Sequence, residues 1–162
     1  MTESDSYKEM SDMGSSIKLT GESLNDVNET VIKEFRTNDG KVGGILEGLP
    51  VVLLHHTGAK TGAPRVTPLC YFEHEGRRFI PASYSGRPKA PAWAHNVRAN
   101  PDITVEIGKE TYTASAVELQ RDERDQFFPE LVRQIPTYGE YQQRTERVIP
   151  LFEIVRAEAN PR

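Results

Sequence analysis

The chain has 162 residues, of which 36% are hydrophobic and 27% charged, and its net charge is −4. This balance is typical of one globular domain, and the acidic excess argues against broad binding to nucleic acid. No run approaches the roughly 18 apolar residues of a membrane span, and we expect no cleaved secretion leader. The lone cysteine, Cys70, excludes an intrachain disulfide and a cysteine-cluster zinc site.

We expect residues 1–20 to be a flexible polar tail and residues 21–162 to form a single domain that opens with a helix. The chain then predicts, in order, a strand over 51–54, a loop over 57–64, hairpin arms over 65–73 and 78–82, a helix over 91–97, strands over 103–107 and 111–119, helices over 121–134 and 138–147, and a strand over 149–155. About six strands at hairpin spacing, interrupted by helices, favour a small antiparallel barrel over a parallel sheet.

Residues 57–89 are locally basic, with six Lys or Arg against two Glu. Within them, Gly58 and Gly62 let backbone amides approach a ligand closely, and Lys60 and Arg65 add positive charge. Two interpretations stay open: a site for a phosphate, or a tight hairpin with cations on its surface.

Other residue types favour no metal and no protein nucleophile. His55 and His56 are adjacent on a predicted strand, so they face opposite sides and cannot share a metal ion. Cys70 is expected to be a small buried hydrophobe. Trp93 belongs either to the core, which is the favoured interpretation, or to a ligand platform. Tyr138 and Tyr141 share one helix face, where they either line an aromatic pocket or pack with their polar tips exposed.

Together these segments resemble the deazaflavin (coenzyme F420)-dependent nitroreductase family. The resemblance rests on Gly48-Leu49-Pro50, Leu53-Leu54, Thr57 to Gly62, Pro64-Arg65, Thr67-Pro68-Leu69, Ala82-Ser83, Pro91, Trp93, Asn96, Ala99-Asn100-Pro101, Tyr138, Tyr141-Gln142, Arg144-Thr145, Arg147 and Ile149-Pro150. It covers roughly residues 30–155.

The resemblance implies a mainly β fold with flanking helices, a split β-barrel of the FMN-binding Greek-key type. It implies coenzyme F420 as cofactor, kept reduced by a partner dehydrogenase. By resemblance, the residues that line the phosphate and chain of the coenzyme are Ala59, Lys60, Thr61, Arg65, Val66, Thr67, Pro68, Leu69 and Cys70. Those that contact its ring and ribityl region are Pro81, Ala82, Ser83, Tyr84, Ala92, Trp93, Ala94, His95 and Asn96.

The resemblance also places Ser83 near the site of hydride transfer and Tyr138 and Tyr141 around the acceptor. Two departures from the family matter. Ile135 stands where the best-known members have a third pocket tyrosine, so bulky nitroimidazoles are poor candidate substrates. Tyr84 and Cys70 also replace residue types that are common in the family.

The expected function is hydride transfer from reduced F420 to a quinone or nitro-type acceptor. Such a protein needs no nucleophile or metal, because the cofactor supplies the chemistry. The alternatives are a non-catalytic F420 carrier or store, and a split-barrel oxidoreductase that uses FMN. We expect a cytoplasmic protein whose membrane contact is at most peripheral, at the inner face of the cell membrane.

Overall fold

A computed structural model describes residues 24–42 and 48–157, so the predicted tail over residues 1–20 lies outside it. The helices are α2 (Leu24–Thr37), α3 (Ala92–Ala99), α4 (Arg121–Gln134) and α5 (Thr137–Gln143), with a short 3₁₀ turn, η2 (Tyr84–Gly86). The strands are β1 (Val51–Thr57), β2 (Pro64–Cys70), β3 (Phe72–His74), β4 (Arg77–Pro81), β5 (Asp102–Ile107), β6 (Glu110–Glu118) and β7 (Leu151–Arg156).

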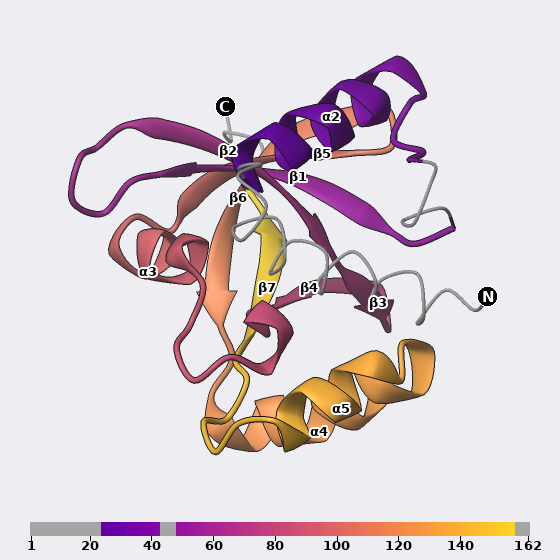
Figure 1. Ribbon diagram of the computed structural model, residues 1–162, viewed down its shortest axis with the longest axis vertical. Helices are drawn as coiled ribbons and strands as arrows, with labels where there is room; N and C mark the ends of the chain where they lie inside the picture. Colours follow the sequence, from indigo (N-terminus) through magenta and orange to yellow (C-terminus); the bar gives the residue numbers. More distant parts are fainter. Residues whose placement is uncertain (1–23, 43–47, 158–162) are drawn as a thin grey trace, which may run out of the picture.

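All seven strands form one antiparallel sheet in the order β2-β1-β5-β6-β7-β4-β3. Strands β2 and β3 are its two opposite edges, yet only Tyr71 separates them in sequence. The sheet must therefore curl until its edges meet at this residue, which produces a barrel-like wall (Figure 1). The predicted mainly β fold with flanking helices is confirmed, and the predicted single arm over residues 65–73 is two strands that bend from one sheet edge to the other.

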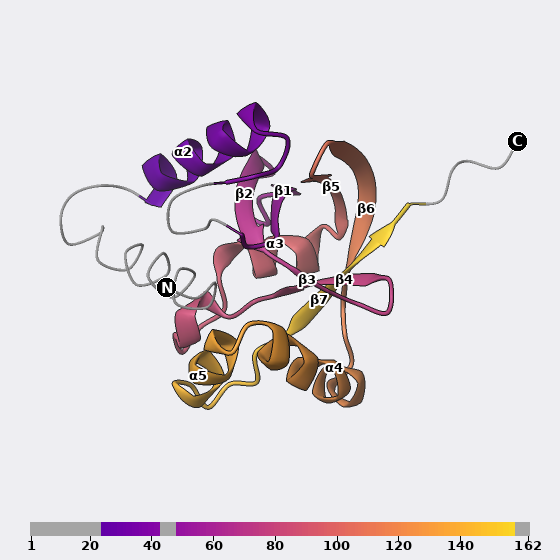
Figure 2. The same ribbon diagram turned by 90° about the vertical axis from the view of Figure 1, so that its right-hand side faces the viewer.

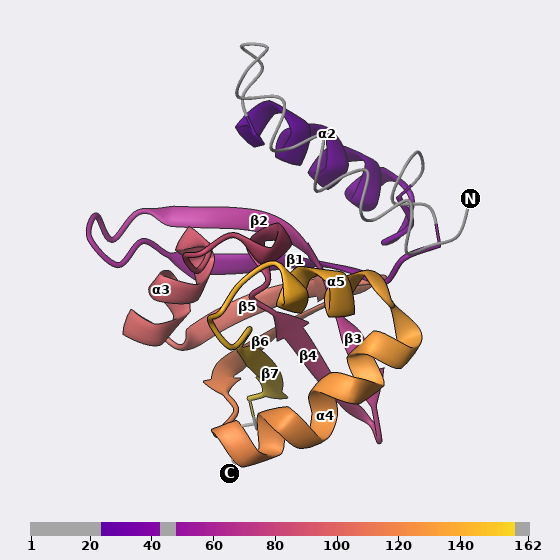
Figure 3. The same cartoon turned by 60° about the horizontal axis from the view of Figure 1, so that its bottom comes forward.

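The helices cover different parts of this curled sheet (Figure 2). α2 lies on one side and α4 with α5 on the other, while α3 closes the end near the β1–β2 hairpin (Figure 3). No helix in the described ranges is both long and apolar enough to cross a bilayer.

Three apolar clusters hold these layers together. The first fills the inside of the sheet, where Trp93 meets Phe152 edge-to-face with ring centroids 5.4 Å apart. The second joins α4 and α5 to β3 and β4 and contains Phe72, Phe79, Tyr138 and Tyr141, among others. The third packs Phe35 of α2 against Val51 and Leu53 of β1. Burial of apolar area on both faces of the sheet therefore stabilises the arrangement of the helices.

Candidate functional site

The predicted cofactor residues come from three segments of the chain. These segments are the β1–β2 loop with β2, the end of β4 with η2, and α3. Figure 3 shows the β1–β2 hairpin extending beside α3. A direct bond joins the two, because the backbone amide of Ala59 donates to the side-chain oxygen of Asn96 at 2.9 Å.

The loop at the hairpin tip is held in one compact shape. The amide of Gly58 donates to the carbonyl of Ala63, and the amide of Gly62 donates to the carbonyl of Gly58, both at 2.9 Å. Gly62 has φ +70°, a conformation in which a residue with a side chain is strained. The amide of Ala63 donates to Thr61 Oγ1 at 3.2 Å. Four loop amides are thus bonded within the protein, and the cationic side chains remain the candidate ligands for an anion.

A buried polar network connects α3 to the base of the hairpin. Asn96 Nδ2 donates to His56 Nδ1 at 3.1 Å, and His56 Nε2 lies 2.9 Å from Thr67 Oγ1. Since Nδ1 accepts, the proton of the neutral ring is on Nε2, which donates to the threonine hydroxyl. His56 and Asn96 are 5% and 8% exposed. The network therefore fixes both the tautomer of His56 and the orientation of the Asn96 amide.

The same network keeps His56 uncharged. Burial, reinforced by the positive charge of Arg65, lowers the pKa of His56 to about 4. A protonated ring would lose its Nδ1 acceptor and repel the nearby guanidinium. His55, the adjacent residue, faces the other side of the sheet and contacts Glu106 at 2.5 Å. The prediction that the two histidines face opposite sides is confirmed.

Four of the six basic residues of segment 57–89 form two contrasting pairs. Arg77 pairs with Glu153 at 2.7 Å and with Glu123 at 3.2 Å, and Arg78 donates to the hydroxyl of Tyr112 at 3.1 Å. These two arginines stabilise the sheet and its contact with α4.

Lys60 and Arg65 differ from those arginines. Both are exposed, and neither makes an ion pair within the ranges that the structure describes. Arg65 also lines a surface cavity of about 660 Å³ that opens between the ends of β1, β2, β5 and β6. These two cations are therefore available to a ligand from outside the chain.

Strand β2 distributes its six predicted residues over both faces of the sheet. Its pairing with β1 sets Arg65, Thr67 and Leu69 opposite His56, Leu54 and Val52, on the inner face. Val66, Pro68 and Cys70 alternate onto the other face. Val66 packs near α2, and Cys70 is buried at 4% exposure, as expected of a small hydrophobe. One ligand therefore cannot contact all six side chains.

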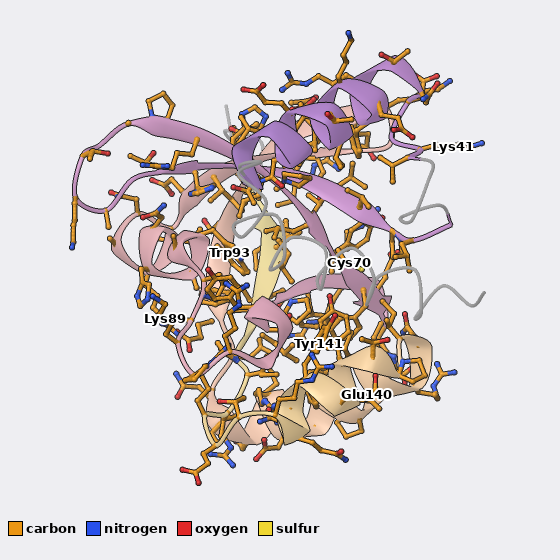
Figure 4. All side chains as sticks on the ribbon, viewed as in Figure 1. Lys41, Cys70, Lys89, Trp93, Glu140 and Tyr141 are labelled. Carbon is orange, nitrogen blue, oxygen red and sulfur yellow. The ribbon has the colours of Figure 1, made fainter. Side chains whose placement is uncertain are left out.

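Helix α3 also presents two faces. Trp93, Ala94 and Asn96 are buried toward the sheet, whereas Ala92 and His95 are exposed. Figure 4 shows Trp93 between α3 and the sheet. Trp93 packs in the core with 6% of its surface exposed, in line with the favoured interpretation, and its contact with the coenzyme stays a prediction.

The segment after β4 is buried and is fixed by hydrogen bonds to its backbone. Ala82 and Ser83 are 0% and 4% exposed, and Tyr84 has φ +46°, which is uncommon for a residue with a side chain. The guanidinium of Arg147 donates to the carbonyls of Ala82, Ser83 and Arg87 at 3.2, 2.7 and 2.9 Å. Sequence reasoning missed this role of Arg147, because no local pattern relates it to residues 60 to 65 positions earlier.

Tyr138 and Tyr141 lie on the sheet side of α5, and both are 0% exposed. Their rings meet edge-to-face with centroids 5.6 Å apart, and Ile135, at 3% exposure, belongs to the same cluster. Figure 4 shows Tyr141 directed toward the sheet while Glu140 points away from it. Both hydroxyls are buried as well, so the interpretation in which the polar tips are exposed is wrong, and the part of the pair in an acceptor pocket stays a prediction.

Comparison with known proteins identifies relatives over most of the chain. An F420H(2)-dependent quinone reductase of Mycobacterium tuberculosis is 36% identical over 126 residues, which cover 75% of this chain and 85% of that protein. A solved structure described as the F420-H2 dependent reductase FDR-A is 40% identical, with a TM-score of 0.59, over 65% of this chain and 93% of that one. Another, described as a domain-swapped dimer, is also 40% identical, with a TM-score of 0.61, over 76% and 90%.

More distant structures share the fold alone. HutZ, the heme storage protein of Vibrio cholerae, is 18% identical with a TM-score of 0.53, over 81% of this chain and 91% of that one. At the level of families, the sequence model described as F420H(2)-dependent quinone reductase matches residues 28–155. The chain belongs to the F420H(2)-dependent quinone reductase family.

Proposed function

We propose that the protein is an oxidoreductase that binds reduced coenzyme F420 at the β1–β2 loop, the segment after β4 and α3, and reduces a quinone. The observation that supports this most directly is the pair of exposed cations, Lys60 and Arg65, beside a loop that is bonded to α3. The phosphodiester and glutamate tail of F420 are anionic, so they fit this pair.

Each segment has a distinct task in this proposal. Lys60 and Arg65 bind the anionic groups, and the loop from Ala82 to Tyr84 positions the ring. When bound, the reduced deazaflavin would supply a hydride, which with one proton from solvent converts the two carbonyls of one quinone into the two hydroxyls of a quinol. The protein orients the coenzyme against the quinone and excludes water from between them. Orientation alone lowers the activation barrier substantially, because the two reactants are held in the reactive geometry. Nitro compounds are a second acceptor class, and a separate dehydrogenase would return F420 to its reduced form.

The test is anaerobic oxidation of reduced F420 by the purified protein with menadione, followed by the return of the visible absorbance of the coenzyme. We expect oxidation that requires both protein and quinone. Tight binding of F420 with no turnover on any quinone would instead indicate a carrier. A parallel titration with FMN tests the alternative of a flavin-dependent oxidoreductase. Tighter binding of FMN than of F420 would favour that alternative.

A further inference from the structure

Arg147 directs its whole guanidinium at one backbone loop. It lies between α5 and β7, and its three nitrogens donate to the carbonyls of Ala82, Ser83 and Arg87. It makes no ion pair with a carboxylate of the residues that the structure describes. A half-buried arginine without such a pair, bonded only to carbonyls, serves to hold the backbone.

Arg147 is itself held by a chain of hydrogen bonds that starts at α4. Arg124 Nη2 donates to Gln142 Oε1 at 2.6 Å, and Gln142 Nε2 donates to the carbonyl of Arg147 at 2.8 Å. Gln142 Oε1 also accepts from the amide of Ile149 at 2.9 Å. The backbone that follows Arg147 is thus anchored to α5 and, through Arg124, to α4.

The three bonds determine which way the loop peptides face. Each peptide is planar and trans, so its N–H points opposite to its carbonyl. Because the carbonyls of Ala82 and Ser83 point at Arg147, the N–H groups of Ser83 and Tyr84 point away from it. The amide of Ser83 donates to no backbone carbonyl within the described ranges. A cation on the carbonyl side also polarises the peptide and strengthens its N–H as a donor.

We propose that Arg147 is a positioning residue for the deazaflavin ring: it holds the Ala82–Ser83 and Ser83–Tyr84 peptides so that the N–H groups of Ser83 and Tyr84 face the polar edge of the ring. This inference rests on the proposed function, since it concerns the same site. It separates two tasks, because Lys60 and Arg65 bind the tail of the coenzyme and Arg147 orients the ring through the loop.

The test compares Arg147→Gln and Arg147→Lys with Arg77→Gln, which removes a similar half-buried arginine from a different part of the sheet. For the folded Arg147 variants we expect kcat with menadione to fall on the order of 10- to 100-fold, the effect of misplacing a reacting group. The Kd for oxidised F420 should rise only a few-fold, because the tail contacts remain. Arg77→Gln should keep the wild-type kcat. A folded Arg147→Lys protein with wild-type kcat would overturn the proposal.

A second measurement uses the unmodified protein and needs no turnover. Binding of oxidised F420 should slow hydrogen exchange at the amides of Ser83 and Tyr84, and unchanged exchange at both would also overturn the proposal, even if neither Arg147 variant folds. The outcome is distinguishable from a failure of the proposed function. A wild-type protein that oxidises reduced F420 but shows no protection disproves the role of the loop alone, whereas one that binds no F420 disproves both.

Discussion

Asn96 accepts a hydrogen bond from the backbone amide of Ala59 at 2.9 Å, across 37 positions of sequence. This bond ties the tip of the β1–β2 hairpin to the first turns of α3. The other end of the same side chain donates to His56, so Asn96 connects the candidate anion-binding loop to the inside of the sheet. Changes at these residues should therefore affect folding stability and coenzyme binding together.

Replacing Asn96 with Ala should lower the free energy of unfolding by about 1–3 kcal/mol, because it leaves the Ala59 amide and His56 Nδ1 without their partner. The loop should also become less ordered, which weakens binding of F420. Urea denaturation measures the first effect and fluorescence titration with F420 the second. Asn100→Ala, at the exposed end of the same helix, is the matched control. Equal stability of the two variants would contradict the role assigned to the network.

Stability should depend on pH through His56. Its pKa is about 4 in the folded protein and near the ordinary 6.5 when unfolded, so the unfolded chain binds the proton more readily between these values. The free energy of unfolding should be highest above pH 6.5 and fall as the pH drops toward 4, by about 3 kcal/mol in all. Urea titrations over this range should show a flatter profile for His56→Gln, while His95→Gln, exposed on α3, keeps the slope. An unchanged slope in His56→Gln would rule out this assignment.

Lys60→Ala and Arg65→Ala should each weaken binding of F420 by about 1.5–3 kcal/mol, the range for hydrogen bonds to charged groups. The difference from wild type should shrink as salt is added, since both cations are exposed and screened. The control is Lys109→Ala, which removes an exposed lysine from the β5–β6 turn. If both site variants bind the coenzyme as wild type does, the loop is an ordinary hairpin with surface cations.

Gly86 and Gly76 offer a matched pair for the loop that Arg147 holds. Their φ angles are +76° and +77°, but a Cβ on Gly86 would lie 2.5 Å from the carbonyl oxygen of Tyr141, whereas one on Gly76 meets nothing within 4 Å. Gly76→Ala should cost about 1–2 kcal/mol from its backbone conformation alone. Gly86→Ala should cost about 1–3 kcal/mol more, because α5 must move. Thermal or urea unfolding measures this difference. Equal losses of stability in the two variants would mean that α5 moves away from the new Cβ at no measurable cost.

The buried tyrosine pair separates packing from acceptor chemistry. Tyr138→Ala and Tyr141→Ala should each cost about 3–5 kcal/mol of stability, while the Phe variants keep the ring and test the hydroxyls. We expect measurable reduction of menadione and little reduction of bicyclic nitroimidazoles, because Ile135 offers no hydroxyl to the same cluster. A faster rate with the nitroimidazole, or full quinone activity in folded Ala variants, would show that the pair does not shape the acceptor site.

Local patterns predicted most of the elements. The helix expected over residues 121–134 matches α4, and the turn at Glu75-Gly76 joins β3 to β4. Both depend on periodicity and turn residues that lie within a few positions of one another. The division of the arm at Tyr71 was not predicted. It arises because the chain passes there from one edge of the sheet to the other, which depends on strand pairing far along the sequence.

By itself, the sequence determined the strand-rich composition, the cationic loop and the resemblance to F420-dependent reductases, because these depend on residue types and local order. Tertiary structure decided which cations are available to bind an anionic ligand. Arg77 forms an ion pair with Glu153 on β7, whereas Lys60 forms none within the described ranges. Tertiary structure also brings the guanidinium of Arg147 to the carbonyls of Ser83 and Ala82, which lie 64 and 65 positions earlier in the sequence. Hydrogen bonds at such separations form only when the sheet curls and brings both segments to one end, and no local pattern encodes that closure.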